Sequence, residues 1–272
     1  MLDTKDTEQI LGEFTDTLRG LDREERTIQE YRRIARVFLT QAEEEEPTDK
    51  EALQFLGKMK EGYKTNTRQV AYYALKALYS MMEWPWGIRS PKVKSYEELN
   101  QPILKPGQIA KMIEKVKEWE DRRLPAYLAV STIYGLRLME MAGITQEHLQ
   151  DQTLLVLTRK GGVPHRHQIA EEIAPYLEGV PWGLGRAGVN KIFKEICYLA
   201  FNDVMPGYGW HSIRRSLVTE MTRKGLDIMM LYKFMRWKPQ GMMAIPMTYA
   251  RLEDPEVDEA VFKKHPFLEM WD

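Results

Sequence analysis

Residues 124–144 read LPAYLAVSTIYGLRLMEMAGI, a strongly apolar stretch that predicts a buried helix of a globular unit. Its only charged residues are Arg137 and Glu140, three positions apart and therefore on one face of a helix. An unpaired buried charge is costly, so the two side chains are expected to interact. Two interpretations stay open. The pair is either a structural ion pair, or an arginine that Glu140 holds rigid so that its guanidinium can bind an anion through two hydrogen bonds.

Length and proline content predict two domains. The chain has 272 residues, which exceeds the usual single domain of about 100–200 residues. Four prolines gather between the two halves, which is typical of an exposed linker: Pro85, Pro91, Pro102 and Pro106. We therefore expect a first domain at 1–90, a linker at 91–104 and a second domain at 105–272.

Composition excludes several classes of protein. Hydrophobic residues make up 43% and charged residues 29%, which are globular values, and no apolar run approaches the roughly 18 residues of a membrane span. The N-terminus, MLDTKDTEQILGEF, lacks the pattern of a secretory signal, so we expect a cytoplasmic protein. The single cysteine, Cys197, excludes a disulfide within the chain and a zinc site built on cysteines.

The first domain is expected to be a small helical bundle. Apolar residues recur at helical spacing in 27–42, 48–61 and from 65 to about 84. Arginines cluster along the first of these segments, but a solvated helix face explains them as well as a binding surface does. The net charge of the chain is −1, although whole-chain charge says little about local patches.

A β-hairpin is expected in the second domain. Thr153–Thr158 is rich in strand formers, residues 159–162 (RKGG) supply a turn, and Val163–Ile169 can return as the partner strand. Lys160 then lies at the hairpin tip, where a lysine is by default only exposed to solvent. His165 and His167 alternate on one strand, but no third ligand is near them in the sequence, so no metal site is expected.

Residues 207–237 predict two helices joined by a glycine turn. The first opens at Trp210 and holds His211 and Arg214 one turn apart on one face. The default interpretation is a buried histidine beside a surface arginine, and the pattern also fits a helix-turn-helix. Trp237 follows the second helix and is by default a core residue. Tyr249 is the one tyrosine after it.

In this order the residues resemble the tyrosine recombinase family, which includes phage integrases, Cre-like enzymes, other mobile-element recombinases and the bacterial recombinases that resolve chromosome dimers. The resemblance covers most of 104–250 and rests on six residues in order: the arginine of a Gly-Leu-Arg with an acid three residues on, a hairpin lysine, the histidine and the arginine of a His-x-x-Arg, a tryptophan and a final tyrosine. The corresponding catalytic set is Arg137, Lys160, His211, Arg214, Trp237 and Tyr249, with Glu140 as the supporting acid. The chain departs from the family in two ways: the position of Trp237 is more often histidine, and the gap of 12 to Tyr249 is slightly long.

The resemblance implies a mainly α fold, in which an N-terminal helical core-binding domain precedes a mostly helical catalytic domain with a small antiparallel sheet. It also implies a 3′-phosphotyrosyl intermediate made by Tyr249. Arg137 and Arg214 would stabilise charge on the phosphate, with His211 and the indole of Trp237 as further donors. His211 is the candidate general base and Lys160 the general acid. No cofactor and no metal ion are expected.

A typical member clamps double-stranded DNA between its two domains and works as a homotetramer on two sites, being a monomer or dimer without DNA. We expect the segment Glu256–Met270 to dock on a neighbouring subunit through an apolar edge. Two other functions stay open: a non-catalytic helix-turn-helix regulator, and a DNA-relaxing enzyme similar to type IB topoisomerases. DNA binding should weaken steeply with salt, and a nucleoid-associated location would follow.

Overall fold

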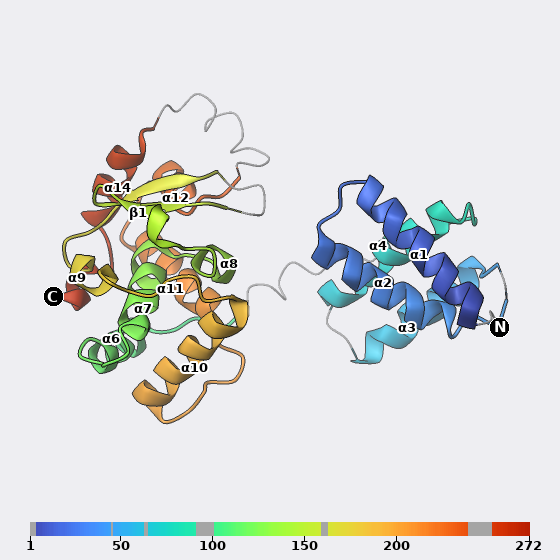
Figure 1. Ribbon diagram of the computed structural model, residues 1–272, viewed down its shortest axis with the longest axis horizontal. Coiled ribbons are helices and arrows are strands. Elements are labelled where there is room, and N and C mark those ends of the chain that lie inside the picture. The colour runs from blue at the N-terminus through green and yellow to red at the C-terminus, as the bar shows by residue number, and fades with distance from the viewer. Residues whose placement is uncertain (1–3, 45, 63–64, 91–100, 159–162, 239–251) are drawn as a thin grey trace. The chain divides into compact units, whose positions relative to one another are not determined.

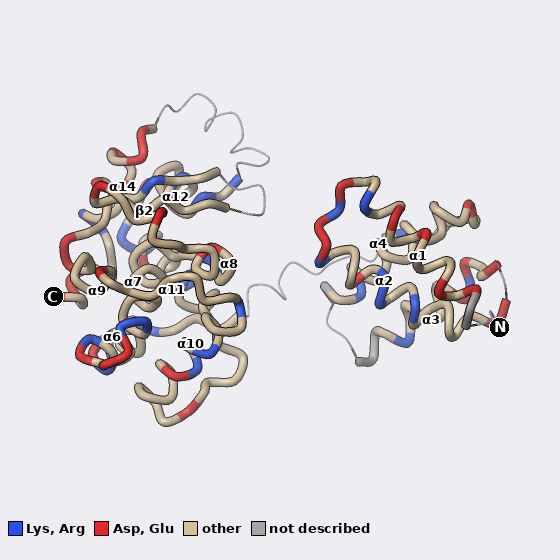
Figure 2. Tube along the Cα trace, viewed as in Figure 1, with Lys and Arg blue, Asp and Glu red and all other residues tan. Residues whose placement is uncertain are grey.

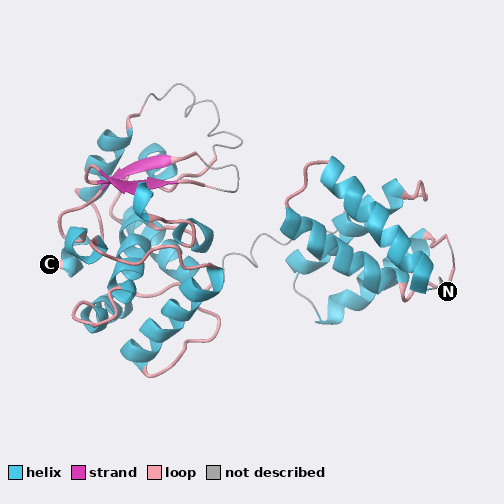
Figure 3. Cartoon of the chain, in the orientation of Figure 1, coloured by secondary structure: helices cyan, strands magenta, loops and turns pink. Residues whose placement is uncertain are grey.

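The computed structural model describes residues 4–44, 46–62, 65–90, 101–158, 163–238 and 252–272. By its internal contacts the chain divides into two compact units, Met1–Asn100 and Gln101–Asp272 (Figure 1). Helices dominate both units, and the second also holds a small antiparallel sheet (Figure 3). The predicted fold class is confirmed.

The first unit is a helical bundle made of α1 (Thr4–Gly20), α2 (Glu25–Leu39), α3 (Asp49–Gly62) and α4 (Thr65–Met81). The last three helices follow the three segments predicted from apolar spacing. Their core is aromatic at its centre, because Phe38 of α2 packs against Phe55 of α3 and Tyr79 of α4, with ring centroids 5.5 and 5.9 Å apart. The Tyr79 hydroxyl donates to the Thr48 carbonyl at 3.1 Å, which satisfies its buried polar end.

The second unit is built around α7 (Arg123–Tyr134), whose residues from Leu124 to Tyr134 are all buried. The chain trace carries almost no charge along this helix (Figure 2), as its sequence requires. The surrounding helices are α6 (Pro106–Val116), α9 (Ala174–Leu177), α10 (Arg186–Phe201) and α11 (Trp210–Arg223). A helix that is apolar on all sides is stable only inside a core, and these neighbours provide one.

The apolar stretch 124–144 is not one continuous helix. Gly135 adopts φ +57° and ends α7, and the chain then runs extended through Arg137 before the short helix α8 (Leu138–Met141). A left-handed backbone favours glycine, which carries no Cβ. The spacing predicted that Arg137 and Glu140 share one helix face, and this prediction is wrong. Arg137 precedes the helix that contains Glu140.

The sheet has three antiparallel strands in the order β1 (Leu149–Gln150), β2 (Thr153–Val156) and β3 (His165–Gln168). The β2–β3 pair confirms the predicted hairpin. Because side chains alternate along a strand, His165 and His167 of β3 point into the unit while Arg166 faces solvent. Contacts with β3 are made by α14 (Asp254–Phe262), which also packs on α12 (Ile228–Phe234).

The C-terminal segment packs on its own unit. Val257 and Val261 of α14 are fully buried, and so is Trp271, in the final 3-10 helix Leu268–Trp271. The indole Nε1 of Trp271 donates to Thr132 Oγ1 of α7 at 3.1 Å. In the single chain the apolar edge of Glu256–Met270 packs into the core of its own unit, and docking of this segment on a neighbouring subunit stays a prediction.

Candidate functional site

Arg137 and Glu140 form a tight ion pair at the start of α8. Glu140 Oε2 accepts the backbone N–H of Arg137 at 2.8 Å, and Oε1 accepts Nη1 of the same arginine at 2.6 Å. The carboxylate is only 3% exposed, whereas the Arg137 side chain is 26% exposed. Glu140 thus fixes both the backbone and the guanidinium of Arg137, and leaves part of that guanidinium accessible to a ligand.

Arg214 lies on α11 and is buried. Its Nη1 donates to the carbonyl of Gly135, and its Nη2 donates to the carbonyl of Met235 at 2.6 Å. The guanidinium therefore joins the turn after α7 to the end of α12. Burial, followed by the positive charges of Arg236 and Arg137, lowers the pKa of Arg214 well below its usual value. A buried guanidinium that remains charged is stabilised by an anion bound near it.

His211, at the second position of α11, is exposed, so the default expectation of a buried histidine beside a surface arginine is reversed. Partial burial lowers the pKa of His211, and Arg214, Arg215 and Arg137 lower it further. The imidazole is therefore neutral at neutral pH and can accept a proton. Arg214 lies one turn after His211 on α11, so the two side chains lie near one another.

Trp237 lies three residues beyond α12 and is half-buried against the core of the second unit. The guanidinium carbon of Arg214 lies 5.9 Å from the centre of the Trp237 rings, within the range of a cation–π interaction. The ring of Tyr232 of α12 contacts the ring of Trp237 edge-on, with centroids 5.0 Å apart. The tryptophan thus packs against an arginine of the cluster as well as against the core.

A third arginine was missed by the sequence analysis. Arg236 is fully buried, and its Nη2 donates to Glu140 Oε2 at 3.2 Å. Burial raises the pKa of Glu140, but Arg236 and Arg137 outweigh it and hold the pKa below its usual value. Two guanidinium groups, those of Arg137 and Arg236, therefore bind one carboxylate, and the charge of Arg214 also lowers the pKa of Glu140. This excess of positive charge suits a phosphate group.

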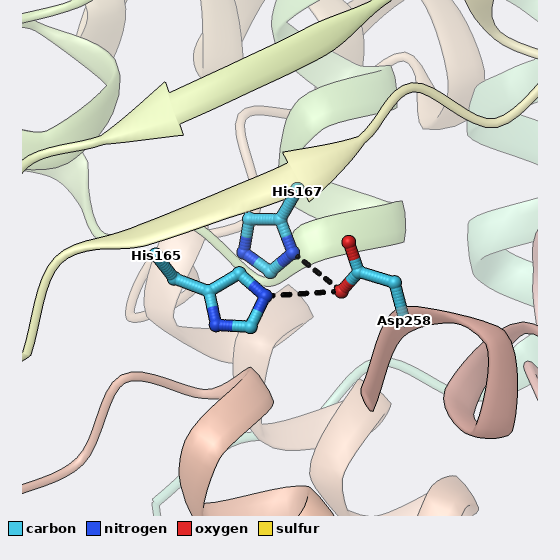
Figure 4. A group of neighbouring side chains, drawn as sticks. All are labelled: His165, His167 and Asp258. Carbon is cyan, nitrogen blue, oxygen red and sulfur yellow. Dashed lines mark hydrogen bonds and ion pairs between the residues drawn. The ribbon is translucent and has the colours of Figure 1, made fainter. Parts of the chain in front are cut away.

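A second cluster joins β3 to α14 (Figure 4). Asp258 Oδ1 lies 3.1 Å from Nε2 of His165 and 3.0 Å from Nδ1 of His167, and all three side chains are buried. Asp258 is the third possible ligand beside the two histidines. The sequence did not reveal it, because it lies 91 residues after His167. Two imidazoles and a carboxylate at these distances could ligate a metal ion.

Two residues of the predicted catalytic set, Lys160 and Tyr249, lie outside the described residues. The structure brings together Arg137, Glu140, His211, Arg214 and Trp237, which come from α8, α11 and the segment after α12. None of the helices in the described part of the chain combines the length and the apolar character that crossing a membrane requires.

Comparison with known proteins gives one similar sequence and several similar folds. No family model matches the chain. It is 26% identical over 279 residues to a tyrosine recombinase, XerA, of Pyrococcus furiosus, and the match covers 93% of each protein. A lambda integrase tetramer bound to a Holliday junction has a similar fold, with a TM-score of 0.65 at 12% identity over 88% of this chain and 76% of that one.

A lambda integrase dimer bound to a COC′ core site gives a TM-score of 0.64 at 14% identity, covering 91% of this chain and 97% of that one. The XerH site-specific recombinase bound to a palindromic difH substrate gives a TM-score of 0.58 at 14% identity, covering 86% of this chain and 77% of that one. The chain is thus similar to a tyrosine recombinase in sequence and to lambda integrase and XerH in fold, which confirms the resemblance that its ordered residues predict.

Proposed function

We propose that the chain is a site-specific DNA recombinase, an integrase, that cleaves and rejoins DNA through a 3′-phosphotyrosyl intermediate. One observation carries the proposal. The guanidinium of Arg137 is held by a buried carboxylate and is still partly exposed, next to the buried Arg214 and the neutral His211. A site with fixed positive charge and an adjacent base suits attack on a phosphodiester.

Binding of the scissile phosphate is the task proposed for Arg137 and Arg214. Charge develops on the non-bridging oxygens during the reaction, and donors that are already fixed stabilise it best. Arg214 is fixed by two backbone carbonyls, and each of its Nη atoms carries a second hydrogen that a phosphate oxygen could accept. Trp237, packed against Arg214, limits the movement of that guanidinium.

The proposed reaction balances without a cofactor. The phenolic oxygen of Tyr249 attacks phosphorus, a bond from tyrosine to phosphorus forms, and the bond from phosphorus to the 5′ oxygen breaks. His211 takes the tyrosine proton, and Lys160 protonates the leaving 5′ oxygen. A 5′ hydroxyl of the partner strand then attacks the phosphotyrosine and reverses these steps. The covalent bond conserves the energy of the phosphodiester, so neither ATP nor Mg²⁺ should be required.

Double-stranded DNA is the proposed partner, which would place the protein on the nucleoid in the cytoplasm. The first unit would be the core-binding domain and the second the catalytic domain. Support comes from the folds that the chain resembles, since those lambda integrase structures hold a tetramer on a Holliday junction and a dimer on a core site. We propose the same homotetramer on two DNA sites.

A nicked DNA substrate in EDTA tests the proposal. The nick lets the short product diffuse away, so that the covalent intermediate accumulates. Libraries of random nicked duplexes serve where the target sequence is not known, and the trapped DNA is then sequenced. The proposal expects a protein–DNA adduct that resists denaturation. A helix-turn-helix regulator would bind without forming one, and that outcome would overturn the proposal.

Product analysis separates recombination from relaxation. A plasmid with two copies of the recovered site should yield rearranged circles, because strands are exchanged between sites. An enzyme similar to type IB topoisomerases would instead relax supercoils and return the parental order of sequence.

A further inference from the structure

Arg236 occupies an unusual position for an arginine. It is the second residue after α12 and lies between Met235, whose carbonyl binds Arg214, and Trp237. Its backbone adopts φ +55°, a left-handed conformation that favours glycine, and its side chain is fully buried. Both the backbone and the buried charge are costly, so the guanidinium must make interactions that compensate for both costs.

The guanidinium of Arg236 makes those interactions on two sides. On one side Nη2 donates to the Tyr134 carbonyl at 3.1 Å and to Glu140 Oε2 at 3.2 Å. On the other side Nη1 donates to the Phe234 carbonyl at 2.9 Å and contacts Nε2 of His167 at 2.6 Å. Arg236 therefore connects the carboxylate that holds Arg137 with a histidine of the sheet.

The contact with Arg236 fixes the protonation of His167. A guanidinium can only donate, so Nε2 of His167 must accept, and the ring proton lies on Nδ1. From there it is donated to Asp258 Oδ1 at 3.0 Å. Burial, despite the nearby Asp258, lowers the pKa of His167 to about 3, which agrees with a neutral ring. Figure 4 shows the rings of both histidines directed at the same carboxylate.

This arrangement argues against a metal ion at His165, His167 and Asp258. A metal would need the lone pair of Nδ1 on His167, and the ring proton would then face the N–H of Arg236 at 2.6 Å. The positive charge of Arg236 would also repel a cation. Hydrogen bonds stabilise the charge of Asp258 instead. Its Oδ1 accepts from Nδ1 of His167, and its Oδ2 accepts the backbone N–H of Gln168 at 2.6 Å.

We propose that Arg236 is a positioning residue, which ties the orientation of Arg137 to the docking of α14 through the series Asp258, His167, Arg236 and Glu140. The proposal rests on the proposed function, in which Arg137 binds the scissile phosphate. Asp258 is the residue through which α14 enters the series, and in the sequence α14 begins five residues after Tyr249. The helix that follows the nucleophile thus sets the geometry of the group that binds the phosphate.

Single-turnover cleavage of nicked DNA at saturating concentration tests the proposal, with the Kd for DNA and the unfolding midpoint measured on the same proteins. Arg236→Gly suits the left-handed backbone and removes the guanidinium. It should slow cleavage on the order of 100-fold, the effect of a misplaced catalytic group, with the Kd for DNA changed less than about threefold. Arg236→Lys should recover part of the rate because it keeps one donor.

Epistasis distinguishes positioning from general damage. Asp258→Asn should slow cleavage on the order of 10-fold in the natural chain and have no further effect on cleavage in the Arg236→Gly background. Glu259→Gln is the matched control, since Glu259 is the next residue on α14 and its side chain is 70% exposed in a pair with Lys263. It should leave the rate unchanged in both backgrounds.

Three outcomes would overturn the inference while leaving the proposed function intact. Arg236→Gly could cleave at the natural rate, the effects of Arg236→Gly and Asp258→Asn could multiply, or one equivalent of Zn²⁺ could bind with loss of binding in Asp258→Asn. If Arg236→Gly does not fold, Arg236→Lys takes its place as the background, and the same non-additivity is expected. A natural chain that forms no adduct on any DNA would instead contradict the proposed function itself.

Discussion

Arg137 and Arg236 share one carboxylate. Glu140 binds the partly exposed Arg137 through both of its oxygens and the buried Arg236 through Oε2. The carboxylate of Glu140 therefore holds both the partly accessible guanidinium of Arg137 and the fully buried guanidinium of Arg236. A carboxylate that lies between two guanidinium groups stabilises the fold and orients the site at once, so its removal should affect both.

Glu140→Gln is expected to lower the free energy of unfolding by about 3 kcal/mol, because it leaves the charge of Arg236 buried without its counterion. Urea unfolding measures this loss. The control is Glu220→Gln, which breaks a pair with Arg223, a residue that is 65% exposed. That change should cost less than about 1 kcal/mol. Equal effects of the two substitutions would contradict the assigned role of Glu140.

Arg214→Lys is expected to slow DNA cleavage by about 100- to 1000-fold, the usual effect of removing a donor to developing charge. A lysine cannot bind the Gly135 and Met235 carbonyls as a planar fork and also donate to a phosphate. Single-turnover cleavage of nicked DNA is the measurement. Arg223→Lys, on the exposed side of the same helix, should cleave at the natural rate. A rate within threefold of natural for Arg214→Lys would exclude Arg214 from phosphate binding.

Stability should fall as the pH drops from 6.5 to 5. Burial lowers the pKa values of His167 and His265 to about 3, so both rings are neutral in the folded chain, whereas the unfolded chain protonates them near pH 6.5. The unfolded state binds more protons in this range, and each histidine removes up to about 1.4 kcal/mol of stability per pH unit. Glu140 and Asp258 have lowered pKa values and add to the loss only below about pH 4.5.

His265→Gln isolates one of these contributions. The natural ring donates from Nε2 to the Ile133 carbonyl at 2.9 Å and accepts the backbone N–H of Phe267 at 3.2 Å, and glutamine can replace both hydrogen bonds without titrating. The variant should lose less stability than the natural chain between pH 6.5 and 5. Identical slopes of unfolding free energy against pH would show that His265 is not held neutral.

Trp271→Ala tests the packing of the C-terminal segment on its own unit. The indole is 1% exposed, donates to Thr132 of α7 and contacts the ring of Tyr176 edge-on at 5.0 Å. Loss of this side chain should cost about 3–5 kcal/mol in urea unfolding. Trp119→Ala, at a position that is 43% exposed, should cost less than about 1 kcal/mol. A negligible effect at Trp271 would mean that the segment leaves its own unit.

The sequence predicted the elements of the second unit better than the connections between them. The apolar content of 124–134 marks a buried helix, and strand-forming residues on both sides of a glycine-containing turn mark the hairpin. The break at Gly135 was not predicted, because a glycine within an apolar run is compatible with a helix, and only the packing of Met235 and Leu217 against it shows why a side chain does not fit.

The candidate site was predicted from the order and spacing of residues that resemble the tyrosine recombinase set, in which Arg137, His211 and Arg214 act together. Burial was not predicted, since a helix of 14 residues gives no sign that Arg214 faces inward and His211 outward. Arg236 and Asp258 carry no local signal at all. Their roles depend on contacts across 96 and 91 residues of sequence, which no periodicity encodes.

The central claim is that this chain breaks DNA through Tyr249. The most direct measurement is mass spectrometry of peptides from the adduct trapped on nicked DNA, together with the same reaction of Tyr249→Phe. The account predicts a nucleotide attached through a 3′-phosphate to the peptide that contains Tyr249, and no adduct from Tyr249→Phe. An adduct at another residue, or one that survives Tyr249→Phe, would contradict it.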